Sequence, residues 1–165
     1  MSWRAILRPG MRAYWLPFSA GLFLVASAFL PWVTLGDESL MGFPDMAALW
    51  IIGLGVLASV LATLSMITRK NSRHPLLLVG LVALGIDLLS WQIAPRTVEE
   101  GARVRSQAAA IVEHAPVGAT PRASAGAGIY LGLGASVLLT AFGLTIVLKR
   151  ASTAYAAVDP NDDVD

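Results

Sequence analysis

Leu76–Ile93 reads LLLVGLVALGIDLLSWQI, eighteen residues with a single charged side chain, Asp87. At about 1.5 Å of rise per residue, a helix of that length is just able to cross the hydrocarbon core of a bilayer. The stretch therefore predicts a transmembrane helix over 76–93 with one acid inside it. Three other apolar stretches of spanning length predict further transmembrane helices over about 14–35, 46–68 and 128–148.

The composition is typical of a membrane protein. Of the 165 residues, 56% are hydrophobic and 14% are charged, whereas a soluble domain carries roughly 25% charged residues. The net charge of +1, with no single basic stripe, gives no indication of nucleic-acid binding. We therefore expect an all-α fold, in which one domain over 1–150 is an integral membrane bundle of four transmembrane helices.

The Lys and Arg residues predict how this bundle is oriented. Eight of the twelve precede the first predicted helix, separate the second from the third, or follow the fourth, whereas the loop over 36–45 has acids and no base. The positive-inside rule then predicts an N-in/C-in topology, with both termini in the cytoplasm. The first apolar stretch also fits a signal peptide ending near Ala26-Ser27-Ala28, but the apolar run continues through Val33, which favours a retained helix.

The long segment over 94–125 is expected to form the outer loop between the third and fourth helices. Thr97 and Glu100 have the spacing of a capping box at the start of a helix. Apolar residues then recur on one helical face at Val104, Ala108, Ile111, Val112 and Ala115. These features predict a short amphipathic helix lying on the outer mouth of the bundle, followed by a flexible return over 118–127. The acidic tail over 151–165 is expected to be disordered.

Asp87 is the first candidate for a functional residue. Acids inside membrane spans are costly, and they usually face the bundle interior or a wet cavity. The antiparallel fourth helix places Tyr130 at a similar depth, so its hydroxyl, or a carbonyl near Gly132, is the expected partner of the carboxyl. One interpretation is a proton or cation relay, or a contact with a partner subunit; the other is an interhelical hydrogen bond that fixes register. We favour the structural or partner-contact interpretation, because a transporter usually needs acids at several depths.

Small residues at four-residue spacing form a second pattern, which predicts close helix packing. They are Gly55, Ser59 and Thr63 in the second predicted helix, and Gly128, Gly132, Ser136 and Thr140 in the fourth. We expect these two helices to pack on each other within one chain. Tryptophans near the ends of the predicted spans are expected to be interfacial anchors. They are Trp15, Trp32, Trp50 and Trp91.

Chemistry at a cofactor or metal is not indicated by this sequence. It has no cysteine, and its two histidines, His74 and His114, do not have the spacing of a metal site. No phosphate-binding loop, nucleophile elbow or zinc-protease motif is present. We therefore expect no cofactor, no metal and no enzymatic activity.

Two short segments carry a resemblance to a group of small four-helix membrane proteins of bacteria. Pro31-Trp32-Val33 stands where such proteins end the first helix, and Gly126-Ala127-Gly128-Ile129-Tyr130 stands where they open the fourth. The resemblance implies only the fold and the location, which, together with a bias toward Ala, Gly and Arg, is expected to be a bacterial cytoplasmic (inner) membrane.

The leading functional hypothesis is a non-enzymatic accessory or assembly subunit of a larger membrane complex. Its partners would be membrane lipids and other integral membrane subunits, bound through helix faces and the outer loop. One alternative is a small transporter or proton-coupled permeation unit using Asp87, for which a homo-oligomer would supply several copies of the acid. Another is a membrane sensor that contacts a ligand or protein through 94–125.

Overall fold

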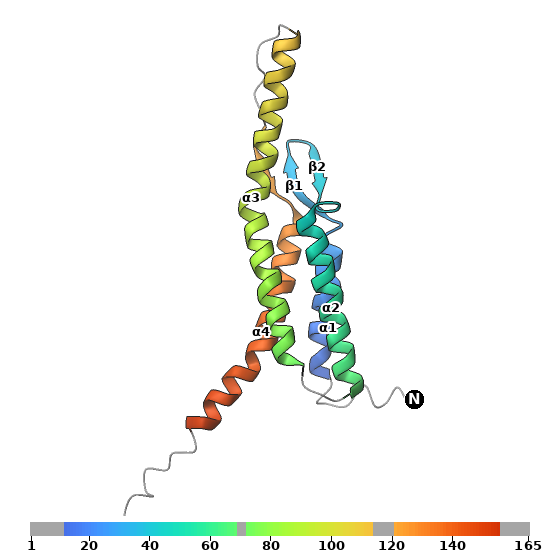
Figure 1. The fold of residues 1–165 in the computed structure, drawn as a ribbon, viewed down its shortest axis with the longest axis vertical. Helices are drawn as coiled ribbons and strands as arrows, with labels where there is room; N and C mark the ends of the chain where they lie inside the picture. Colours follow the sequence, from blue (N-terminus) through green and yellow to red (C-terminus); the bar gives the residue numbers. More distant parts are fainter. Residues whose placement is uncertain (1–11, 69–71, 114–120, 156–165) are drawn as a thin grey trace, which may run out of the picture.

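The computed structural model describes residues 12–68, 72–113 and 121–155. Within them the protein is mostly helical, with four α-helices and one small antiparallel sheet. The elements in chain order are η2 (Arg12–Tyr14), α1 (Trp15–Ser27), β1 (Pro31–Leu35), β2 (Glu38–Met41), α2 (Met46–Thr68), α3 (Arg73–Glu113), β3 (Ala123–Ala125) and α4 (Ala127–Tyr155). Successive helices run antiparallel, and the sheet lies at the end of the bundle where α1 ends and α4 begins (Figure 1).

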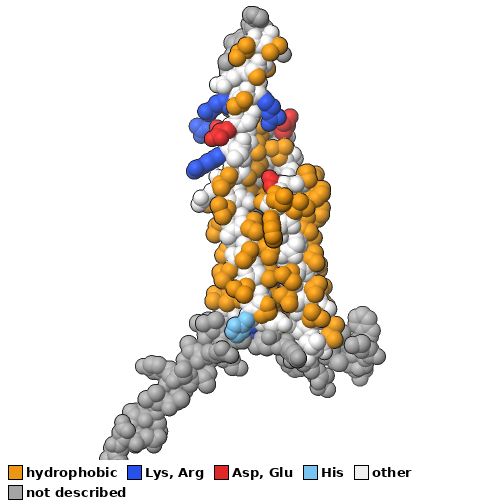
Figure 2. Space-filling model, viewed as in Figure 1, with side chains coloured by type: hydrophobic (Ala, Val, Ile, Leu, Met, Phe, Trp, Pro, Cys, Tyr) orange, Lys and Arg blue, Asp and Glu red, His pale blue; other side chains and the backbone are white. Residues whose placement is uncertain are grey.

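The bundle is built from two closely packed helix pairs, α1 with α2 and α3 with α4, and α1 also contacts α4. Contact between α2 and α3 is much sparser. The largest fully buried apolar side chains are Leu24, Ile51, Leu76, Ile129 and Leu139. Large hydrophobic side chains also cover the outside of the bundle (Figure 2). Among the described residues, three helices, α2, α3 and α4, are long and apolar enough to cross a membrane, which indicates a membrane protein.

The first helix is shorter than the sequence predicts. A helix over about 14–35 is expected, but α1 ends at Ser27, and Pro31–Leu35 forms strand β1. Pro31 cannot donate a helical hydrogen bond, and proline disfavours helical geometry in the residue before it. The sequence that follows, WVTL, is aromatic and β-branched, which suits a strand. An apolar run does not distinguish these two conformations.

The small sheet was not predicted from the sequence. Strands β1 and β2 form a hairpin whose turn contains Gly36 at φ +60, in the left-handed region that favours glycine. Strand β3 pairs with the other side of β1, so the order is β2-β1-β3. The pairing also corrects the expectation of a flexible return over 118–127, because Ala123–Ala125 is ordered against β1; residues 118–120 lie outside the described residues.

Helix α3 is much longer than the predicted span over 76–93. It continues through Pro95 and Gly101 to Glu113, so the expectation of a separate amphipathic helix folded across the bundle is wrong. Thr97 does not form a capping box: its hydroxyl donates to the carbonyl of Ala94 within the helix, at 3.0 Å. A proline removes one helical hydrogen bond, and the helix continues past it into a stretch that includes the good helix formers Glu99, Glu100 and Ala102.

The part of α3 beyond the bundle, residues 99–112, is called the arm here. It projects past the hairpin instead of lying on the bundle (Figure 1). Ala115 and Pro116 of the predicted amphipathic stretch lie outside the described residues. Helix α4 reaches Tyr155, so its last turn occupies the beginning of the tail that is expected to be disordered, and the rest of that tail also lies outside the described residues.

Candidate functional site

Asp87 lies in the contact between α3 and α4 and is fully buried. Neither carboxyl oxygen has a hydrogen-bond partner among the residues that the structure describes. The Ser136 side chain of α4 lies next to the carboxyl, but its hydroxyl donates to the carbonyl of Leu133 at 3.0 Å. The carboxyl packs against Gly132, where an added β-carbon would lie 2.8 Å from Oδ1. The acid therefore lies in a closely packed part of the contact between α3 and α4.

Tyr130 does not meet Asp87. Its side chain is exposed, whereas that of Asp87 is completely buried, so the predicted hydrogen bond between them is wrong for this structure. The other expected contact, near Gly132, is where the carboxyl packs. Tyr130 instead lines a surface cavity of about 510 Å³ with Trp91, Gln92 and Arg96 of α3 and residues of β3.

The small residues of α2 pack on α1, not on α4. A β-carbon at Gly21 would lie 2.7 Å from the carbonyl oxygen of Gly55, and a β-carbon at Gly55 would lie 2.7 Å from that of Gly21. Ser59 extends this contact, because its hydroxyl would lie 2.5 Å from a β-carbon at Gly21. Thr63 donates to the carbonyl of Ser59 within α2, at 2.8 Å.

The small residues of α4 pack mainly on α3. A β-carbon at Gly80 of α3 would lie 2.7 Å from the backbone nitrogen of Thr140, and Gly132 faces Asp87 as described above. At the sheet end, Gly128 packs against Trp32 and the carbonyl of Ser27. The expected packing of α2 on α4 is therefore wrong, and each stripe of small residues serves a different neighbour.

The tryptophans expected at the interfaces divide into two kinds. Trp15, Trp50 and Trp91 are exposed, as interfacial anchors would be, and that role stays a prediction. Trp32 is only 4% exposed, and its indole N–H donates to the carbonyl of Ser27 at 3.0 Å. Its anchor assignment is wrong because Trp32 occupies an irregularity in the β1–β2 register, between the pairs of Pro31 and Val33, and such bulges redirect side chains.

The two segments that carry the family resemblance lie against each other. Gly126 donates its N–H to the carbonyl of Trp32 at 2.7 Å, and Val33 pairs with Ala125 in the sheet. A β-carbon at Gly128 would lie 2.6 Å from the Trp32 ring. These residues join the end of the first helix to the start of α4, which the spacing in the sequence alone does not reveal.

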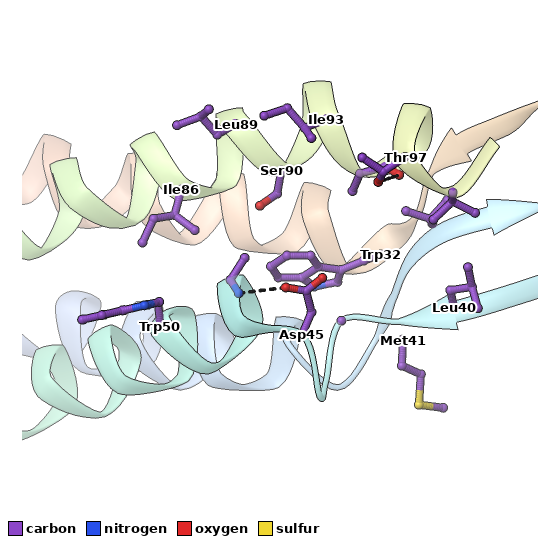
Figure 3. A pocket seen from close by; sticks show the side chains of 15 residues that line it. Trp32, Leu40, Met41, Asp45, Trp50, Ile86, Leu89, Ser90, Ile93 and Thr97 are labelled. Atoms are coloured by element: carbon purple, nitrogen blue, oxygen red, sulfur yellow. Dashed lines mark hydrogen bonds between the residues drawn. The ribbon is translucent and has the colours of Figure 1, made fainter. Parts of the chain in front are cut away.

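A larger cavity of about 610 Å³ opens between α2 and α3 beneath the hairpin. Trp32 and the hairpin form one end of it, Asp45 and Trp50 contribute from the start of α2, and Ser90 points into it from α3 (Figure 3). One oxygen of Asp45 accepts the N–H of Ala47 at 3.0 Å, which caps α2. The sparse contact between α2 and α3 explains why the bundle opens here. Sequence reasoning missed this site, because its parts are brought together by the unpredicted hairpin.

Comparison with known proteins gives no match: the chain matches no known family, no curated protein and no solved structure.

Proposed function

We propose that this protein is a non-enzymatic accessory or assembly subunit of a larger membrane complex, and that the arm of α3 is a docking element. The observation that carries the proposal is an apolar face on the arm. Val104, Ile111 and Val112 are 63%, 77% and 79% exposed on a helix that leaves the bundle. An apolar face of this kind on an isolated helical segment is a feature of partner-binding helices.

The proposed topology has four spans with both termini in the cytoplasm of a bacterial cell. The antiparallel order of the helices supports it (Figure 1), as does the sequence, in which eight of the twelve Lys and Arg residues precede α1, stand around the connection between α2 and α3, or come late in α4. Helix α1 has 13 residues, about 20 Å of rise, so its crossing is completed by the residues that lead into the sheet. In this topology the hairpin and the arm face the extracytoplasmic side.

Docking through the arm is tested by purifying the tagged protein from its native membrane in mild detergent. Val104 and Ile111 are changed together to serine, and Ala102→Ser/Ala109→Ser on the other side of the arm is the matched control. We expect the wild type and the control to carry a stoichiometric set of larger membrane subunits, identified by mass spectrometry, and the V104S/I111S protein to lose them. A wild-type protein that runs alone or as a homo-oligomer contradicts the proposal.

A small transporter that uses Asp87 is the second candidate, and the observation that favours it is a fully buried acid without a hydrogen-bond partner in the described part of the chain. Against it, Asp87 lines neither of the two cavities described above. The two candidates are separated by comparing the wild type with Asp87→Asn. If the protein is a transporter, the variant should lose proton or cation flux into liposomes. If it is an accessory subunit, the variant should still carry its partners.

A further inference from the structure

The cavity between α2 and α3 opens onto the apolar surface of the bundle. Trp50, Leu89 and Ile93 are exposed and also line the cavity. Figure 2 shows hydrophobic side chains covering this face of the bundle, with charged side chains gathered mainly toward the end that carries the hairpin and the arm. When the bundle is embedded in a bilayer, acyl chains would therefore meet the opening directly. An apolar space of this size beside lipid is filled readily, because its walls otherwise lack contact partners.

Two polar groups in the cavity have unused bonding capacity. Ser90 is only 9% exposed, points into the cavity, and its hydroxyl has no hydrogen-bond partner among the described residues (Figure 3). Asp45 uses one carboxylate oxygen to cap α2 and has the other available. By contrast, the hydroxyl of Thr97 and the indole N–H of Trp32 are already bonded to backbone carbonyls, at 3.0 Å in each case.

These groups are ordered along the cavity. The end far from the hairpin is apolar and is lined by Ile86 and Trp50 (Figure 3). Ser90 follows one helical turn later, about 6 Å along α3. Asp45 lies on the hairpin side of Trp50. This order of groups along the cavity, apolar, then hydroxyl, then carboxylate, matches the parts of a glycerophospholipid. Its acyl chain would lie at the apolar end, its ester carbonyl beside the hydroxyl donor, and a cationic head group beside the carboxylate.

The charge of the site selects among phospholipids. No Lys or Arg lines the cavity, and Asp45 is the one charged residue among those that line it. A lipid with net negative charge would be repelled by this carboxylate, whereas a primary ammonium can donate to the free oxygen of Asp45. We propose that this cavity binds a phospholipid with a primary-ammonium head group, one acyl chain lying between α2 and α3, with Ser90 donating to its ester carbonyl.

The test uses the full-length protein in vesicles made of equal amounts of phosphatidylethanolamine and phosphatidylglycerol with identical acyl chains. Native mass spectrometry after mild detergent extraction counts the lipids retained. We expect the wild type to retain phosphatidylethanolamine about fivefold over phosphatidylglycerol, the factor available from a partly exposed charge pair. Asp45→Asn should abolish the preference while keeping the cap, because asparagine caps helices as well as aspartate.

A substitution that fills the cavity tests whether the lipid binds there. Ala94→Phe projects a ring into it and should remove one retained lipid, whereas Leu88→Phe, on an exposed face of α3, should retain as many as the wild type. A wild type without head-group preference, or an Ala94→Phe protein that keeps its lipid, overturns the proposal.

If Ala94→Phe does not fold, tryptophan fluorescence of the wild type is the second test. Brominated phosphatidylethanolamine should quench this fluorescence more than brominated phosphatidylglycerol does at equal mole fraction, and equal quenching overturns the proposal. None of these assays contains a protein partner, so they are independent of docking by the arm.

Discussion

The carboxyl group of Asp87 lies directly against Gly132, and a β-carbon at position 132 would lie 2.8 Å from Oδ1 and 3.2 Å from Oδ2. The acid on α3 and the missing side chain on α4 therefore fit together. We predict that Gly132→Ala lowers the free energy of unfolding by about 1–3 kcal/mol, because the methyl group must displace a fully buried carboxyl. Thermal loss of the helical circular dichroism signal in detergent measures this.

Gly134→Ala is the matched control for that variant. It lies two residues further along α4, and a β-carbon there would meet nothing within 4 Å. Alanine is the better helix former, so this variant should be as stable as the wild type or up to about 1 kcal/mol more stable. Equal destabilisation by the two variants would show that the contact with Asp87 is not the cause.

The contact between Asp87 and Gly132 also predicts that the stability effects of substituting these two residues are not additive. Asp87→Ala removes the group with which the new methyl of Gly132→Ala collides, so the double variant should be more stable than the sum of the two single effects predicts. We expect a coupling of about 1–2 kcal/mol, within the range measured for residues in contact. Strict additivity would mean that the two residues do not act on each other.

A second close approach lies between Gly21 and Gly55, where α1 crosses α2. A β-carbon at Gly21 would overlap both the Ser59 hydroxyl and the Gly55 carbonyl, so Gly21→Ala should force the helices apart at a cost of about 1–3 kcal/mol. Gly53→Ala on α2 is the control, because it faces open space. Thermal unfolding of both proteins in the same detergent separates the effect of close packing on stability from that of helix propensity.

Trp32→Phe is predicted to weaken the junction between the hairpin and the bundle. The change removes the indole N–H that donates to the Ser27 carbonyl, which then keeps only the 3.3 Å bond from the N–H of Leu30, at a cost of about 0.5–1.5 kcal/mol. Trp91→Phe at an exposed position should cost less than about 0.5 kcal/mol. Hydrogen exchange should also accelerate in β1 and β2 of the Trp32 variant, and unchanged exchange there would contradict the assignment.

The long apolar helices could be predicted from the sequence, because burial in lipid requires long runs of apolar residues that are easy to read. Helix α2 has the bounds 46–68 expected of it. The predictions around Pro31 and Pro95 were wrong in opposite ways. At Pro31 an apolar run hides a change from helix to strand, and at Pro95 a helix breaker stands inside a helix that continues.

The candidate sites were harder to predict, because each depends on which helices are neighbours. Helical spacing identifies Gly55 and Gly132 as packing residues but does not say that one meets Gly21 and the other Asp87. The cavity depends on a hairpin that brings Trp32 to the same cavity as Ser90, two residues far apart in the sequence. Pairing between distant segments leaves no periodic signal in the chain.

The length of α3 determines how far its free end can extend from a bilayer. Forty-one residues of continuous helix extend over about 60 Å, and the hydrocarbon core of a bilayer takes up about half of that. In the proposed topology, α4 packs along the membrane-embedded part of α3, and the free end of α3 stands beyond the lipid head groups. A partner that binds this end would then have to extend an equal distance from the membrane, which disfavours partners that lie flat on the bilayer surface.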